Sequence, residues 1–196
     1  SNSSINGAIL KDTISPNKPI ISDVSVDSNG KSVISWSSSS TDVDVYAIYL
    51  LDEFGAWITL DSVYGFNNNT FTFSASNAVN NYETFSIRSI DSCGNASSRS
   101  IMHNSMNIIS KINICDLSIN FNWNEYINFE DGLSHYKIFI NTTNLNGDIS
   151  YDSVRTNNLS FSIENIREGF NYYFYVAAYN GDSSLVAISD QVNYLI

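Results

Sequence analysis

The residues with the clearest capacity for chemistry are the two cysteines, Cys93 and Cys115. Cys93 lies in "SIDSCGNASS" (89–98), where Asp, Ser, Gly and Asn favour a tight turn over regular structure. Both cysteines are equally far from Asn104, so a turn there would bring them together as in a long hairpin. A disulfide closing a loop of about 20 residues would contribute roughly 3 kcal/mol. This spacing leads us to predict a disulfide between Cys93 and Cys115.

The alternative is two free thiols in a straight chain. The segment 98–112 contains neither Pro nor Gly, so it could run unbroken from one domain into the next. In such a rod the cysteines would lie near opposite ends, too far apart for the Cα separation of about 5.5 Å that a disulfide needs. A disulfide therefore requires a folded-back pair of domains, whereas free thiols are consistent with a rod.

Other reactive groups are sparse. The two histidines, His103 and His135, are not part of an HExxH motif, and the chain has no glycine-rich phosphate loop and no G-x-S-x-G motif. Asp42 and Asp44, two residues apart in a predicted loop, are a weak candidate for calcium ligands. No third carboxylate follows at an EF-hand spacing, so a polar loop is the simpler interpretation. We predict no catalytic residues, no cofactor and no metal.

A candidate ligand platform is centred on Trp57 in "FGAWITLDSV" (54–63). Alternation puts Trp57 on the face opposite to Ile58 and Leu60, which we expect to be the core face. Together with Phe54, Tyr64 and Phe66, Trp57 could form an exposed aromatic surface that stacks on a sugar or seats a partner. The alternative is that Trp57 covers a sheet edge or packs on the neighbouring domain.

Composition excludes several classes of partner. The 196 residues include 9 Lys and Arg against 20 Asp and Glu, and the formal charge of −11 would repel nucleic acid and anionic membranes. The longest apolar runs, such as "VYAIYLL" (45–51), are much shorter than the ~20 residues that span a bilayer. We therefore predict no nucleic acid partner and no membrane span, and we expect a monomer.

Almost every apolar segment alternates with period two or is a short β-branched and aromatic run bounded by Ser, Asn, Asp and Gly. The predicted fold class is therefore all-β. The two halves also repeat each other, since Trp36, Tyr46 and Asp61-Ser62-Val63 recur 87, 90 and 91 residues later. This period is the size of one small sandwich. We predict a tag and linker over residues 1–15 and domains over 16–103 and 104–196, with other domains of the same polypeptide beside them.

Each half offers about seven strands with regularly spaced turns, as in two immunoglobulin-like β-sandwiches in tandem. The segment "IREGFNYYFYVAAYNGD" (166–182) resembles the fibronectin type III pattern, in which a tyrosine, here Tyr172, forms a tyrosine corner. This resemblance implies that Trp36 and Trp123 are buried between sheets. In the first half the pattern is broken, and either Phe85 takes the corner position without a hydroxyl or a bulge restores Tyr82.

The resemblance extends to a narrower group. The sequence "DSCGNAS", then "IMHNSM" and "C…INFNWNEY", is similar to the tandem fibronectin-like repeats of gliding-motility-associated bacterial surface proteins. It implies export by the type IX secretion route and a location that is secreted or on the bacterial cell surface. The sorting domain of those proteins is absent from this sequence.

Three functions are consistent with these observations. The first is a non-catalytic structural or adhesive module of a larger surface protein, acting as a spacer or protein-interaction segment. The second is a carbohydrate-binding accessory module of a secreted polysaccharide-degrading enzyme, for which aromatics around Trp57 would be required. The third is a receptor-like pair that binds a protein through the loops at one end or in the crease between domains, and it predicts an exposed apolar patch there.

Overall fold

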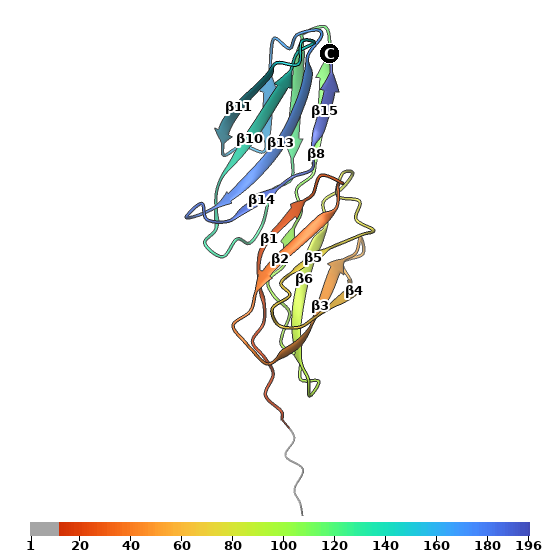
Figure 1. The fold of residues 1–196 in the computed structure, drawn as a ribbon, viewed down its shortest axis with the longest axis vertical. Helices are drawn as coiled ribbons and strands as arrows, with labels where there is room; N and C mark the ends of the chain where they lie inside the picture. The colour runs from red at the N-terminus through yellow and green to blue at the C-terminus, as the bar shows by residue number, and fades with distance from the viewer. Residues whose placement is uncertain (1–11) are drawn as a thin grey trace, which may run out of the picture.

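A computed structural model describes residues 12–196, and every regular element in this range is a β-strand (Figure 1). The predicted tag and linker lie mostly outside the described residues, and residues 12–19 form an extended segment that leads into the first strand. Between residues 12 and 196 there is no helix long and apolar enough to cross a membrane.

The strands of the N-terminal half form two antiparallel sheets that face each other. One sheet has the order β1-β2-β5 and the other β4-β3-β6-β7. The seven strands are β1 (Ile20–Val26), β2 (Ser32–Ser37), β3 (Val43–Leu51), β4 (Trp57–Tyr64), β5 (Thr70–Thr72), β6 (Thr84–Asp91) and β7 (His103–Asn104). The predicted boundary between residues 103 and 104 falls inside β7.

The C-terminal half repeats this plan. Its sheets have the orders β8-β9-β12 and β11-β10-β13, and both β14 and β15 pair with the free side of β13. The eight strands are β8 (Ile108–Asn113), β9 (Ser118–Trp123), β10 (Leu133–Thr143), β11 (Ile149–Thr156), β12 (Ser160–Ile163), β13 (Asn171–Asn180), β14 (Val186–Ile188) and β15 (Val192–Leu195).

Both halves therefore have the strand order of a fibronectin type III-like sandwich, in which the fourth strand joins the larger sheet. The predicted fold class, all-β with immunoglobulin-like sandwiches, is confirmed. Figure 1 shows the two sandwiches stacked end to end, and the chain passes from one into the other through β7 and β8.

The sequence repeat is also a structural repeat, because the same aromatic pair fills each sandwich. Trp36 and Tyr46 meet edge to face at 5.3 Å between ring centroids, and Trp123 and Tyr136 do so at 5.8 Å. All four rings are buried. Such pairs contribute roughly 0.5–1.5 kcal/mol beyond the burial of their area, so each sandwich has its own aromatic centre.

The tyrosine corner is present in the second half. Tyr172 is buried, and its hydroxyl oxygen accepts a hydrogen bond from the backbone N–H of Arg167 at 3.0 Å. This bond ties the start of β13 to the preceding loop, which is the role that the corner has in sandwiches of this kind.

In the first half a carboxylate replaces this corner. Phe85 is fully buried and Tyr82 is half exposed, so Tyr82 is not restored. The strand registers align Glu83 with Tyr172, and the Glu83 carboxylate accepts the backbone N–H of Asn77 at 2.8 Å. The hydroxyls of Ser32 and Ser76 donate to the same carboxylate.

We expect Glu83→Gln to lower the free energy of unfolding by roughly 1–3 kcal/mol, because Gln lacks the charge that strengthens the hydrogen bonds from Asn77, Ser32 and Ser76. Urea unfolding measures this effect. The control is Glu53→Gln in the exposed β3–β4 turn, which should stay within about 0.5 kcal/mol of wild type. An equal effect of both substitutions would contradict the corner role of Glu83.

Candidate functional site

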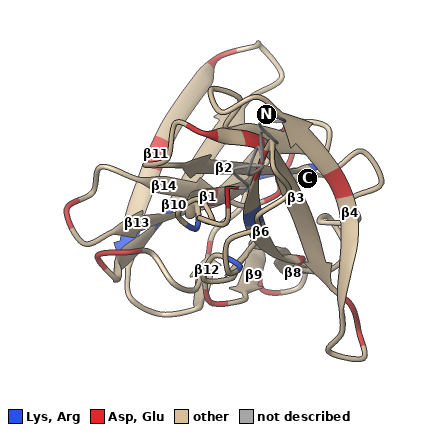
Figure 2. Ribbon diagram, turned by 90° about the horizontal axis from the view of Figure 1, so that it is seen from below, with Lys and Arg blue, Asp and Glu red and all other residues tan. Residues whose placement is uncertain are grey.

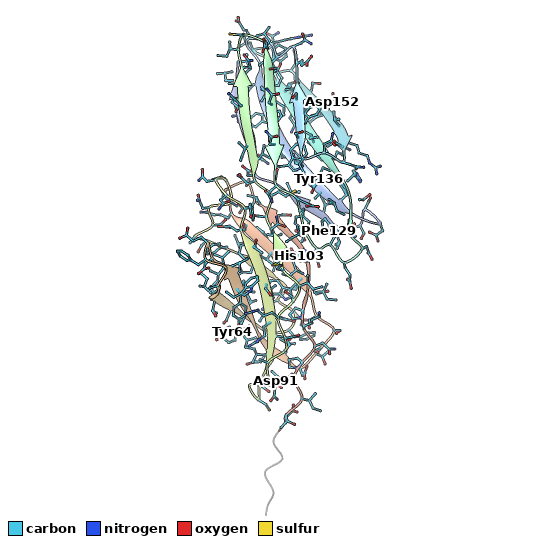
Figure 3. All side chains as sticks on the ribbon, turned by 180° about the vertical axis from the view of Figure 1, so that it is seen from behind. Tyr64, Asp91, His103, Phe129, Tyr136 and Asp152 are labelled. Atoms are coloured by element: carbon cyan, nitrogen blue, oxygen red, sulfur yellow. The ribbon has the colours of Figure 1, made fainter. Side chains whose placement is uncertain are left out.

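The predicted disulfide is not formed, because Cys93 and Cys115 are both free and exposed. Cys93 follows the end of β6 in a turn where the Asp91 carboxylate accepts the backbone N–H groups of Cys93 and Asn95. Asp91 lies at the far end of the N-terminal half (Figure 3). Cys115 lies in the β8–β9 turn at the far end of the C-terminal half (Figure 1).

The prediction of a folded-back pair is therefore wrong, and the physical reason lies in the segment between β7 and β8. The backbone N–H of Ser105 donates to the Glu83 carbonyl, and that of Asn107 donates to the Asn124 side chain. Ser105, Met106 and Asn107 are all buried. These contacts hold the segment extended, so the chain does not turn at Asn104.

Within residues 12–196, no third side chain joins the candidate calcium ligands Asp42 and Asp44 to form a metal site. Asp42 and Asp44 are exposed, and the Asp44 backbone carbonyl accepts the N–H of Gly65. Within residues 12–196 no group of three His, Cys, Asp or Glu side chains could hold a metal ion.

The predicted aromatic platform does not form as one surface. Trp57 begins β4 and Tyr64 ends it, which separates them by roughly 23 Å at 3.3 Å per residue. Phe54 is strongly exposed in the turn beside Trp57, and Phe66 lies beyond Tyr64. The Arg99 guanidinium carbon is 5.1 Å from the Trp57 ring centroid and therefore lies over this ring. Trp57 is thus partly covered by the side chain of Arg99, which lies in the segment between β6 and β7.

The junction between the halves contains a network of buried polar contacts. Its centre is Tyr126, which lies in the loop between β9 and β10 but inserts its hydroxyl into the N-terminal half. This oxygen accepts the backbone N–H of Val24 at 3.0 Å and lies 2.9 Å from His103 Nδ1. Because the phenol oxygen already accepts from Val24, its own proton is free to donate to His103 Nδ1.

We assign His103 as neutral, with an unprotonated Nδ1 that accepts the phenol proton. The imidazole is buried and packs edge to face on Tyr126 and Phe129, and Figure 3 places His103 and Phe129 at the junction. Burial lowers the pKa of His103 to about 4. Burial also raises the pKa of Tyr126 well above its ordinary value, so the phenol keeps its proton.

Side-chain amides form a second layer of the junction. Asn104 donates to the Glu125 carbonyl at 2.8 Å and accepts the Ile127 N–H at 2.9 Å. Asn107 donates to the Ala78 carbonyl at 3.1 Å. Each bond joins residues that belong to different sandwiches or to the segment between them, so rotation of one half against the other would break several buried hydrogen bonds at once.

One carboxylate is buried in the same region. Asp190, just before β15, accepts the backbone N–H of Ile108 at the start of β8 at 2.8 Å. Burial raises the pKa of Asp190 to about 6. The ionised form is thus disfavoured by the protein around it, although the hydrogen bond from Ile108 partly offsets this effect.

A hollow of about 240 Å³ opens beside the His103 ring. Its lining combines apolar side chains, Ile20, Ile101 and Phe129, with polar and charged ones, Lys18, Asn128 and Glu130. Ile20 and Ile101 are both more than one-third exposed. Two apolar side chains of the crease are therefore exposed, and the receptor-like hypothesis stays a prediction.

The C-terminal half also carries an aromatic surface that was not predicted. The outward side chains of β10 and β13 form two stacked pairs, Phe139 with Tyr175 at 4.7 Å and His135 with Tyr179 at 4.8 Å between ring centroids. The signal was present in "YYFYVAAY" (172–179), whose alternate tyrosines point away from the core.

Comparison with known proteins identifies no family. No family model matches the sequence, and no curated protein matches it. Among solved structures, the crystal structure of the FN1–FN3 domains of chicken CNTN1 is similar at a TM-score of 0.39 and 17% identity. The match covers 92% of this chain and 66%, just under two thirds, of that chain. The fold assignment therefore depends on the strand order and tyrosine corner of this chain.

Proposed function

We propose that this chain is a non-catalytic, rigid spacer of two sandwiches within a larger secreted or surface-anchored bacterial protein. The observation that carries the proposal is the buried junction, in which the Tyr126 hydroxyl bridges Val24 and His103. A flexible linker would leave such polar groups in water, whereas here they are paired inside the protein. The bacterial surface location is supported by the sequence resemblance alone.

Rigidity at the junction has a mechanical consequence. The apolar cores of the two halves are continuous, because Ile21, Val24 and Met106 pack in one cluster with Tyr126 and Phe129. Because the two halves form one rigid unit, such a spacer would fix the relative orientation of the domains attached to its ends as well as the distance between them. Its partners would be the neighbouring domains of the same polypeptide, and the apolar crease is available to a surface protein.

The native cysteines provide a direct test, because they are exposed at opposite ends of the molecule. Donor and acceptor dyes attached to Cys93 and Cys115 should give one narrow transfer-efficiency peak in single-molecule measurements. The same labelled chain carrying Tyr126→Ala should give a broader or shifted peak. A broad distribution in the wild-type chain would mean that the halves swivel, and the rigid spacer would then be abandoned.

A further inference from the structure

Two strands leave long sheet edges without a neighbour. β4 and β11 each lie at the end of the strand order of their sheet, and with eight residues each they are the longest edge strands between residues 12 and 196. Figure 1 places them at the outer margins of the two halves. Because an edge strand presents unpaired N–H and C=O groups, a second copy of the chain could add its own strand there.

The strand β11 has several features that favour such pairing. Its register against β10 runs from Thr156 to Ile149 without a bulge. Ile149 and Tyr151 are 57% and 73% exposed, and the strand contains no proline. Long, regular and partly apolar edges pair readily with other strands. A chain that stays monomeric therefore needs a feature that blocks this edge.

Both strands contain the repeated Asp-Ser-Val sequence, and in each the Asp carboxylate binds the next backbone N–H. Asp61 Oδ1 accepts the N–H of Ser62 at 2.7 Å, and Asp152 Oδ1 accepts the N–H of Ser153 at 2.6 Å. In an antiparallel ladder, alternate residues direct their N–H groups to the neighbouring strand and to the free side. We assign the two serine N–H groups to the free side, because each donates to a carboxylate of its own strand.

The register explains where these carboxylates start. Asp61 is paired with Ile48 and Asp152 with Ile140, and both isoleucines are buried. The two Asp side chains therefore leave their strands on the core-facing side of each sheet. Both are nevertheless exposed, because β4 and β11 are edge strands. Inward-pointing charges at sheet edges are one of the ways in which proteins prevent edge-to-edge pairing.

The hydrogen bond and the charge act together against an added strand. Asp61 and Asp152 are the acidic residues of β4 and β11, and Figure 2 shows red on both strands. The carbonyl oxygen of an added strand would have to replace the carboxylate at the serine N–H, so a charge-assisted hydrogen bond would be lost. We propose that the two Asp-Ser-Val motifs are edge-protecting motifs, whose carboxylates prevent a second copy of the chain from pairing with β4 or β11.

The test is sedimentation velocity of the intact chain over a series of protein concentrations. The edge variant Asp61→Ala/Asp152→Ala is compared with Asp42→Ala/Asp44→Ala, which removes two exposed carboxylates that are not on an edge strand. Because each variant loses two of the 20 Asp and Glu, both change the formal charge from −11 to −9. We expect the edge variant to dimerise with a dissociation constant at least about tenfold lower than that of the wild type or the control.

Hydrogen exchange followed by mass spectrometry locates the contact. In the edge variant, exchange in the peptides that contain Ser62 and Ser153 should slow as the protein concentration rises, because a second copy then binds these N–H groups. Aggregation of unfolded chains would instead leave exchange fast in the core strands.

Three results would overturn the proposal. The first is an edge variant that associates no more tightly than the wild type, and the second is equal association of the two double variants. The third is association without slower exchange in β4 and β11. The proposal is independent of the rigid spacer, because the dye experiment reports on the junction and sedimentation reports on the sheet edges.

Discussion

Replacing Tyr126 by alanine is expected to lower the free energy of unfolding by about 3–5 kcal/mol and to separate the unfolding of the two halves. The ring is fully buried and packs on Phe129 at 4.3 Å between centroids, so its loss leaves a cavity in the junction. It also leaves the Val24 N–H and His103 Nδ1 without their partner. The wild-type chain should unfold in one transition and the variant in two.

A conservative variant separates the two contributions. Tyr126→Phe keeps the ring but removes the hydroxyl, and we expect a loss of roughly 1–3 kcal/mol from the unpaired buried groups. Tyr64→Ala, which truncates a tyrosine that is 69% exposed, should change stability by less than about 0.5 kcal/mol. Urea unfolding followed by fluorescence and by circular dichroism measures all three. If Tyr126→Phe were as stable as wild type, the hydroxyl would have no bridging role.

The fold could be predicted because its determinants are local and repeated. Period-two alternation marks most of the strands, and the pairs Trp36–Tyr46 and Trp123–Tyr136 mark the same place in each sandwich. The tyrosine corner at Tyr172 was also visible, because it depends on an apolar residue and a tyrosine at a short fixed spacing. Such signals need no knowledge of distant contacts.

The path of the chain between the halves could not be predicted in the same way. Two cysteines placed symmetrically about Asn104 are compatible with a hairpin or a rod. Hydrogen-bond partners that lie far away in the sequence determine which of the two forms. Asn104 is held by Glu125 and Ile127, and Asn107 is held by Ala78. A polar residue that looks suited to a turn is here a buried hydrogen-bonding residue.

Two features, the Glu83 corner and the aromatic surface of β10 and β13, were not predicted, and the reasons differ. Glu83 as a corner residue departs from the aromatic pattern, and only its three donors identify it. The stacked pair of Phe139 and Tyr175 depends on the register of β10 against β13, which no local sequence pattern gives. Trp57 was predicted to be a ligand platform because of its residue type and strand position, but the Arg99 guanidinium lies over its ring.

The second large effect concerns pH, because two junction groups titrate with opposite consequences. His103 has a pKa of about 4 in the folded chain, below its usual 6.5. Its stabilising contribution is complete above pH 6.5 and is lost as the pH falls toward 4. Asp190 has a folded pKa of about 6, above its usual 3.8. Its contribution is complete below pH 3.8 and is lost as the pH rises through 6.

Each contribution is about 3 kcal/mol at about 1.4 kcal/mol per pH unit, so the two largely cancel between pH 4 and 6.5. Asp23, whose pKa is also raised by burial, lies beside the same junction and acts in the same direction as Asp190. The wild-type chain should therefore lose little stability on mild acidification, despite the buried histidine.

Asp190→Asn should remove this compensation. The Asn Oδ1 can still accept the Ile108 N–H, while the cost of a buried charge at neutral pH disappears. We expect the variant to be more stable than wild type at pH 7 by up to about 3 kcal/mol, and to lose a similar amount between pH 6.5 and 4 as His103 becomes protonated. Urea unfolding at half-unit pH intervals measures both effects.

The histidine variant should show the opposite slope. His103→Asn keeps an acceptor for the Tyr126 hydroxyl but no longer titrates, so its stability should rise on acidification from pH 6.5 to 4 as Asp190 takes up its proton. The loss of the imidazole ring lowers the free energy of unfolding of this variant at every pH. The informative quantity is therefore the change of that free energy with pH. Glu168→Gln on the surface should reproduce the wild-type profile. Parallel profiles for all four proteins would show that neither junction group controls stability, whereas opposite slopes for Asp190→Asn and His103→Asn would show that the junction balances a buried acid against a buried base.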